Sequence, residues 1–316
     1  MSALPKPSTL FFLTVPPLMW ASNAIVGRLS VAGGDPLISP LLLNALRWVV
    51  TLLLLAPVVL LRPGWAGAKG TPAAARADLA RAHRRAWRTY AAFGLLSVAG
   101  YNALQYTALR TSSAINVTLI AAGGPLFVLL IGRLFFGAHA RRWAWIGATL
   151  SLVGVLVVLT GGDAGRLAQL RLVPGDLLMV AATIVWALYS WLLRERRPDV
   201  GVLPLLLLQT AWGVALSLPI VGVEWLSGQY VLRLEPLTLG IVVWVALGPS
   251  LLAYWCWDRG VSHAGPLLPS FFANLTPLLT ALMSAALLGE PPHLFHGLAF
   301  LLIVAGIAVS QRGARA

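Results

Sequence analysis

Neutral polar side chains inside long apolar runs are the residues of this sequence that could bind a small molecule. Ser270, Asn274 and Pro277 follow one another at spacings of four and three residues, which places them on one face of a helix. The other members of this polar set are Asn23, Tyr101, Asn102, Gln105, Tyr106, Asn116 and Gln209. Hydrogen bonding between helices accounts for about half of such residues. The rest can supply the neutral donors and acceptors that a cavity for a zwitterion needs.

Aromatic side chains lie beside this polar set. Trp and Tyr deep in an apolar run can form a cavity wall that packs against an apolar or aromatic ligand, although core packing explains any single one. Trp near the end of a run usually anchors a helix at the membrane surface, and this role is expected for Trp65, Trp87, Trp143, Trp225 and Trp257. The predicted substrate site therefore consists of Trp20, Asn23, Tyr101, Asn102, Gln105, Asn116, Trp186, Tyr189, Tyr254, Ser270 and Asn274.

Groups for catalysis, metal binding or proton relay are missing from the apolar runs. All ten acidic residues, including Asp258, fall at or beyond the ends of the predicted helices, and His263, His293 and His296 are close to such ends. Cys256 is the only cysteine. We therefore expect no enzyme, no cofactor and no metal site. We also expect a substrate to move down its gradient without a carboxylate relay in the middle of the membrane.

The chain that carries these residues is that of an all-α integral membrane protein. Of its 316 residues, 59% are hydrophobic and 10% are charged, with a mean hydropathy of +0.83. Soluble domains have about 25% charged residues, and runs of about 20 apolar residues cross a bilayer as helices. Ten transmembrane helices are predicted, over residues 9–30, 37–61, 89–109, 112–136, 140–160, 174–194, 201–224, 236–257, 264–288 and 293–311.

Positive charges are concentrated in every second connection between these helices. Loops rich in Lys and Arg stay in the cytoplasm, so both termini are expected to be cytoplasmic. The net charge of +13 then reflects topology, and no nucleic acid partner is expected. The longest connection, 62–88, is a basic cytoplasmic loop in which a short amphipathic helix could lie on anionic lipid.

One pattern occurs twice in the chain. Pro125, Gly137 and Gly154 are followed 152 residues later by Pro277, Gly289 and Gly306, and Trp20-Ala21 recurs as Trp186-Ala187. The small-residue pairs Gly147/Ser151 and Gly306/Ser310 predict close packing of the fifth and tenth helices. The repeats are predicted as 9–160 and 174–311. Because each has five helices, the second is inverted relative to the first, with a site near the midplane between them.

The repeated proline breaks its helix at equivalent places. Pro125 and Pro277 each remove a backbone donor and free the carbonyl four residues earlier, which belongs to Ala121 and Ala273 respectively. A simple kink is one interpretation. Because broken helices line the site in inverted-repeat carriers, we expect Gly124, Pro125 and Pro277 to act as a hinge or gate.

These motifs resemble those of a known family. Residues 17–23, with Arg28, look like the opening of an EamA-type repeat, as do Arg47 and the Phe136-Gly137 turn. The whole chain resembles a ten-helix carrier of the drug/metabolite transporter superfamily, and it is most similar to amino-acid exporters of the YddG type. The first repeat departs from the family's Gly-Glu turn, since it has Gly137-Ala138 where the second has Gly289-Glu290.

The resemblance implies a protein of the bacterial cytoplasmic (inner) membrane that exports amino acids, aromatic or apolar ones in particular, or similar small metabolites by alternating access. It also implies a second helix beside the cavity, so Arg47 is interpreted as structural, although it could bind a substrate carboxylate. The expected partners are a small-molecule substrate and the bilayer. A monomer suffices for a complete pathway, and the sequence leaves open whether the protein forms oligomers. The alternatives are a drug or sugar-related carrier, a membrane enzyme acting on lipid, and a non-transporting lipid-handling protein.

Overall fold

The computed structural model describes residues 7–29, 37–62, 71–112, 114–169, 173–228, 230–288 and 293–312. In these segments the chain is helical apart from turns and one isolated β-bridge between Ile38 and Leu232. The elements are α1 (Pro7–Leu29), α2 (Pro40–Leu61), α3 (Pro72–Phe93), η1 (Gly94–Gly100), α4 (Tyr101–Ala108), α5 (Ala114–Ala122), α6 (Gly124–Phe135), α7 (Arg142–Thr160), η2 (Ala164–Gln169), α8 (Pro174–Glu195), α9 (Val202–Leu226), α10 (Pro236–Val245), η3 (Ala246–Leu252), α11 (Ala253–Ala264), α12 (Leu267–Ala273), α13 (Thr276–Leu288) and α14 (Leu294–Gln311). Elements η1 and η3 are π-helical, and η2 is a 3₁₀ helix.

Proline marks the start of several of these helices. Pro40, Pro72, Pro174 and Pro236 occupy the first helical turn of α2, α3, α8 and α10. A missing N–H costs nothing there, because the first-turn donors have no partner within the helix, and the fixed φ of proline already suits a helix.

The helices agree with a membrane-spanning protein. Seven of the described helices are long and apolar enough to cross a membrane, and α5 with α6, bent by 47° at their junction, add an eighth. The predicted spans 9–30 and 89–109 fall on α1 and on the α3–η1–α4 run, which do not meet the same test. The all-α membrane class is confirmed, and the number of ten spans stays a prediction.

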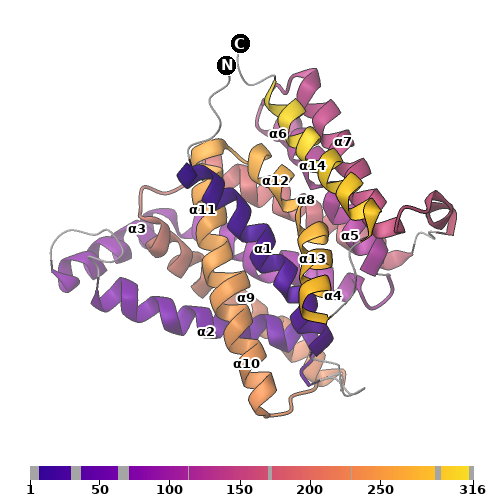
Figure 1. Ribbon diagram of the computed structural model, residues 1–316. Coiled ribbons are helices and arrows are strands. Elements are labelled where there is room, and N and C mark those ends of the chain that lie inside the picture. Colours follow the sequence, from indigo (N-terminus) through magenta and orange to yellow (C-terminus); the bar gives the residue numbers. More distant parts are fainter. Residues whose placement is uncertain are drawn as a thin grey trace.

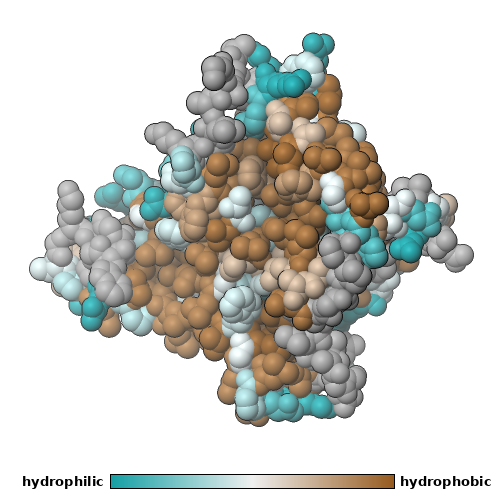
Figure 2. Space-filling view, in the orientation of Figure 1, coloured by the Kyte–Doolittle hydropathy of each residue, from teal (hydrophilic) through white to brown (hydrophobic). Residues whose placement is uncertain are grey.

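The surface shows the same character. Figure 2 shows hydrophobic residues covering the middle of one face, with hydrophilic residues gathered around its edges. Leu53 of α2, Phe135 of α6, Leu226 of α9 and Leu301 of α14 are all exposed. Large apolar side chains facing outward over several helices suit contact with lipid, because lipid tails are as apolar as these side chains.

The structure repeats its irregular segments at the spacing of the sequence repeat. The π-helical segment η1 begins at Gly94 and η3 begins at Ala246, 152 residues later. Gly123 separates α5 from α6, and Asn274-Leu275 separates α12 from α13 at the same spacing. The breaks beside Pro125 and Pro277 are therefore matched features. That the two repeats are inverted stays a prediction.

The predicted packing of small residues is present where α7 and α14 cross. A Cβ atom added to Gly147 would lie 2.5 Å from the carbonyl oxygen of Gly306, and one added to Gly306 would lie 2.7 Å from that of Gly147. Real Cβ atoms do not approach an oxygen this closely, so both positions need glycine. Figure 1 shows α7 and α14 lying side by side along their length.

The basic connection 62–88 is largely helical in its described part. Residues 72–93 form α3, which is interrupted by a kink at Ala86 (φ −130°, ψ 26°) and is mostly exposed before Ala86. The expected amphipathic helix is thus longer than predicted, and residues 63–70 lie outside the described segments, as do Gly289 and Glu290. In Figure 1 the start of α1 and the end of α14 lie at the same, upper end of the molecule.

Candidate functional site: a cavity between the two halves

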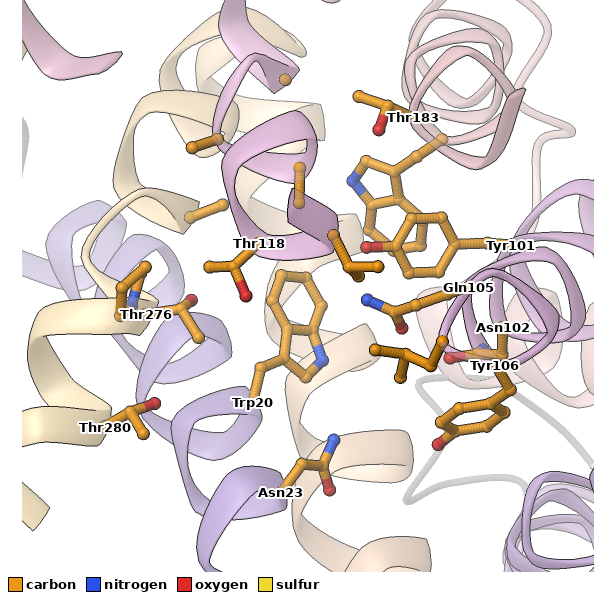
Figure 3. A pocket seen from close by; sticks show the side chains of 18 of the residues that line it. Trp20, Asn23, Tyr101, Asn102, Gln105, Tyr106, Thr118, Thr183, Thr276 and Thr280 are labelled. Carbon is orange, nitrogen blue, oxygen red and sulfur yellow. The ribbon is translucent and has the colours of Figure 1, made fainter. Parts of the chain in front are cut away.

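A cavity of about 680 Å³ lies among helices from both halves of the chain (Figure 3). This volume is in the range of about 300–1,000 Å³ that is usual for small-molecule sites. Eleven of the fourteen predicted site and hinge residues line it: Trp20, Asn23, Tyr101, Asn102, Gln105, Gly124, Trp186, Tyr254, Ser270, Asn274 and Pro277. The other three, Asn116, Pro125 and Tyr189, do not.

Trp186 is at the centre of an aromatic wall. Its ring lies 5.0 Å from Tyr101, 5.6 Å from Trp20 and 5.6 Å from Tyr254, measured between centroids. The rings of Trp20 and Tyr254 meet it edge to face, a favourable geometry for aromatic pairs. The indole Nε1 of Trp20 also donates to the carbonyl oxygen of Pro249 at 3.2 Å, which fixes this ring at the cavity edge.

Trp257 belongs to this wall, so its prediction as a surface anchor was wrong. Its ring lies 5.0 Å from Trp186, and the residue is 1% exposed. The apolar run ends near residue 257, but the helix continues through η3 and α11 to Ala264, which leaves Trp257 well inside it. Trp87 and Trp225 are exposed, as expected of anchors, and Trp143 is half-buried. Trp65 lies outside the described residues.

Tyr189 lies behind the wall, where it contacts a buried carboxylate. Its hydroxyl donates to Oδ1 of Asp258 at 2.8 Å, and Asp258 is completely buried. The expectation that every acidic residue falls at or beyond the end of a helix is therefore wrong for Asp258, for the same reason as for Trp257. Asp258 does not line the cavity.

Asn116 is part of a helix cap and not of the cavity lining. Its Nδ2 donates to both carboxylate oxygens of Asp176 at 3.2 and 3.1 Å, and the hydroxyl of Ser112 donates to the same carboxylate. Asp176 also accepts from the backbone N–H of Val173 at 2.9 Å. A carboxylate in the first turn of α8 is favoured by the helix dipole. Asn116 thus ties α5 to the start of α8.

Asn274 joins the two helix breaks. In a regular helix the N–H of Leu126 would donate to the carbonyl of Ala122. Here it donates to the carbonyl of Gly123, so the break leaves the Ala122 carbonyl without its helical partner. The side-chain Nδ2 of Asn274 donates to this carbonyl at 3.1 Å and to Oγ of Ser151 at 2.9 Å. The second break therefore satisfies a backbone group that the first break frees, as a membrane interior requires.

The prolines next to these breaks differ in their position. Pro277 lines the cavity, whereas Pro125 is buried in α6 away from it. Ala121 and Ala273, whose carbonyls the two prolines free, both line the cavity. The predicted hinge is thus beside the cavity in both copies.

Two amides are free to meet a ligand. The side-chain amides of Asn23 and Gln105 have no hydrogen-bond partner among the described residues, and in Figure 3 both side chains extend toward the ring of Trp20. By contrast, the hydroxyl of Ser270 donates to Leu267 of its own helix at 2.6 Å. Asn102 is buried, with its Nδ2 3.5 Å from the Ser97 carbonyl.

Sequence reasoning passed over several lining residues. Thr118, Thr183, Thr276 and Thr280 are labelled around the cavity in Figure 3. Threonine is an inconspicuous signal in a membrane helix because its hydroxyl can bond to its own helix, as Thr183 does with Met179 at 2.9 Å. Arg47 also lines the cavity, although it was interpreted as structural.

A second polar cluster closes one end of the bundle. The side chain of Glu224 accepts from the hydroxyl of Ser39 at 2.8 Å and from the N–H of Leu42 at 3.0 Å. Its other oxygen lies 3.3 Å from Arg110, which is partly exposed. This fully buried carboxylate therefore ties the end of α9 to the start of α2 and to the residues after α4.

Comparison with known proteins identifies the family. The model of the EamA-like transporter family matches residues 7–160 and 173–311. The chain is 28% identical to an uncharacterized transporter YyaM of Bacillus subtilis (strain 168), over 71% of this chain and 72% of that protein. It is 27% identical to an aromatic amino acid exporter YddG of Ancylobacter novellus, over 73% of this chain and 78% of that one.

Two further likenesses cover almost the full length. An uncharacterized inner membrane transporter YedA of Escherichia coli (strain K12) is 25% identical over 98% of this chain and 92% of its own. A protein of known crystal structure has the same fold, with a TM-score of 0.75, 22% identity and coverage of 98% and 99% of the two chains. Because the family model matches nearly all of the sequence, the chain belongs to the EamA-like transporter family.

Proposed function

We propose that this transporter exports amino acids with aromatic or apolar side chains, or similar small metabolites, by alternating access around the cavity. The observation that carries the proposal is the aromatic wall of Trp20, Trp186 and Tyr254 beside the unpaired amides of Asn23 and Gln105. Such a site gives an apolar side chain a surface to pack against and gives the polar end of a ligand neutral hydrogen-bonding groups. The likeness to an aromatic amino acid exporter supports the same substrate class.

The broken helices supply the moving parts in this proposal. The α5–α6 junction bends by 47°, and the α12–α13 junction lies at the equivalent position of the second repeat. Irregular backbone beside a cavity is where inverted-repeat carriers bind and gate their substrates. We expect the two five-helix repeats to move against each other about these junctions, so that one chain contains a complete pathway.

The proposed energy source is the gradient of the substrate itself. Among the described residues that line the cavity, none is aspartate, glutamate or histidine, and Asp258 lies behind the wall. Counterflow in liposomes should therefore run at the same rate with and without a proton gradient, in the unaltered protein and in Asp258→Asn. Counterflow that requires the proton gradient would refute transport without a carboxylate relay.

The proposed location is the bacterial cytoplasmic membrane with both termini in the cytoplasm. A cysteine added after residue 312 should react with an impermeant maleimide only in inverted vesicles. Reaction in intact cells would overturn this orientation, while the transport proposal would stand.

Exchange assays on purified protein test the substrate class. Liposomes loaded with unlabelled amino acids should take up labelled phenylalanine or tryptophan in a saturable manner, and drugs and sugars should not compete. Trp186→Ala should reduce this exchange at least tenfold, whereas Leu301→Ala, on the lipid-facing surface of α14, should not. Competition by sugars or cationic drugs without exchange of any amino acid would favour another substrate class.

A further inference from the structure

Arg47 is a charged residue in an otherwise neutral cavity. It belongs to α2, is 3% exposed and lines the cavity; among the described lining residues no other is charged. It follows the start of α2 at Pro40 by seven positions, which is about 10 Å along a helix. Its side chain is therefore buried within the protein beside the cavity.

The guanidinium group has no anionic partner in the part of the chain that the structure describes. Its Nε is buried without a hydrogen-bond acceptor, and no carboxylate forms an ion pair with it. The contact that it does make is a cation–π contact, with Cζ 5.2 Å from the centroid of the Trp48 ring.

The carboxylate of Glu224, which contacts the start of α2, already has hydrogen-bond and ion-pair partners. Glu224 accepts hydrogen bonds from Ser39 and Leu42 and forms an ion pair with Arg110. Asp258 on α11 accepts from Tyr189. A structural role for Arg47 would be expected to include a salt bridge or a capped carbonyl, and the described residues provide neither.

A buried, unpaired guanidinium is costly and stays charged, because arginine does not lose its proton in proteins. Such a group is stabilised by an anion, and a carboxylate fits its planar fork with two parallel hydrogen bonds. Since the group faces the cavity, the anion that fits is part of the transported molecule.

We propose that Arg47 binds the carboxylate of the substrate, so that the transporter selects small aromatic or apolar carboxylates over the corresponding amines. The inference rests on the proposed function and narrows it, because the positive charge disfavours cationic drugs. The ring of Trp48, over which the guanidinium lies, contacts Tyr254 at 4.7 Å between centroids. Tyr254 and Tyr101 in turn contact Trp186, so the carboxylate subsite adjoins the aromatic wall.

Three indole compounds that differ at one group test the proposal. Indole-3-acetate is a carboxylate, indole-3-acetamide is its neutral counterpart, and tryptamine is a cation. Equilibrium dialysis of the purified full-length protein should show that the acetate binds at least tenfold more tightly than the acetamide, as expected for a charge-assisted hydrogen-bonded pair. Arg47→Gln should remove this preference, and Arg47→Lys should retain part of it.

Thermal stability without ligand separates this role from a structural one. Removing an uncompensated buried charge should leave the melting temperature of Arg47→Gln equal to or above that of the unaltered protein. Arg142→Gln, at the exposed start of α7, is the matched control and should change neither stability nor preference.

Several outcomes would overturn the proposal. They are equal binding of acetate and acetamide, no binding of any of the three compounds, an unchanged preference in Arg47→Gln, and a lower melting temperature in that variant with unchanged affinity. The proposed function fails separately if the acetate preference depends on Arg47 but no amino acid is exchanged. If amino acids are exchanged independently of Arg47, only the carboxylate subsite fails.

Discussion

Replacing Asn274 by alanine would disconnect the two helix breaks. The amide of Asn274 is the described group that bonds the carbonyl of Ala122 across the repeats, and it also donates to Ser151. The residue is 3% exposed, so water does not readily replace the lost donor. We expect the fold to persist, because α12 and α13 remain packed, and the α5–α6 junction to become less stable.

The expected cost follows from the two lost hydrogen bonds. Hydrogen bonds between membrane helices contribute about 0.6 kcal/mol on average and up to about 1.7 kcal/mol. Asn274→Ala removes two, at 3.1 and 2.9 Å, and leaves a buried carbonyl without a partner. The free energy of unfolding should therefore fall by about 1–3 kcal/mol.

A double-mutant cycle isolates the contact with Ser151. Reversible unfolding in mixed micelles, followed by tryptophan fluorescence, should give a coupling energy of about 0.5–1.5 kcal/mol between Asn274→Ala and Ser151→Ala. Ser270→Ala is the control, because that hydroxyl bonds only within its own helix, and it should change stability by less than about 0.5 kcal/mol.

Strictly additive effects of the two substitutions would refute the role of Asn274 as a link between the breaks. An unchanged stability in Asn274→Ala would refute it as well. If the link also restrains the hinge, amino-acid exchange in Asn274→Ala should differ at least twofold from that of the unaltered protein, while Leu301→Ala, on the exposed face of α14, should match it.

Two other substitutions test the packing around the cavity. Gly147→Val should separate α7 from α14 and lower the melting temperature, because even a Cβ atom there would lie 2.5 Å from the Gly306 oxygen. Gly240→Val is the control and should leave the melting temperature unchanged, because no atom of another helix lies within 4 Å of a Cβ added there. Glu224→Ala removes the acceptor shared by three donors and should lower the free energy of unfolding by about 2–4 kcal/mol, measured by the same unfolding assay. A melting temperature unaltered in either variant would contradict the corresponding contact.

The helices and their duplication could be predicted because both depend on local patterns. Long apolar runs place the membrane helices, and the repeated Pro125 and Pro277 fall beside matched breaks in the structure. The spacing of Gly147 and Gly306 from their serine partners was sufficient to predict a close helix crossing, since the absence of a side chain is itself a sequence signal.

The helix ends could not be predicted from apolarity alone. A hydropathy pattern ends where polar residues begin, but α11 continues to Ala264 with the polar residue Asp258 buried within the protein. Asp258 is tolerated there since Tyr189 donates to it. This contact joins residues 69 positions apart, and no local pattern reveals it.

The individual roles of polar residues depend on distant partners as well. Asn116 and Asn274 are both amides in apolar helices, yet the first binds Asp176 and the second binds a freed carbonyl. For Arg47 the sequence left a structural role and carboxylate binding both open. The structure adds that its buried Nε has no hydrogen-bond acceptor among the described residues.

Filling the cavity tests whether the substrate passes through it. Thr280 lies on the cavity wall and makes only a long contact of 3.5 Å with the Ala21 carbonyl, so tryptophan at this position would extend into the space that the substrate needs. Equilibrium exchange of labelled phenylalanine or tryptophan should occur with the unaltered protein in liposomes. In Thr280→Trp it should fall to the level of empty liposomes, with the melting temperature preserved. Full exchange in the folded variant, or no exchange of any amino acid by the unaltered protein, would contradict the account.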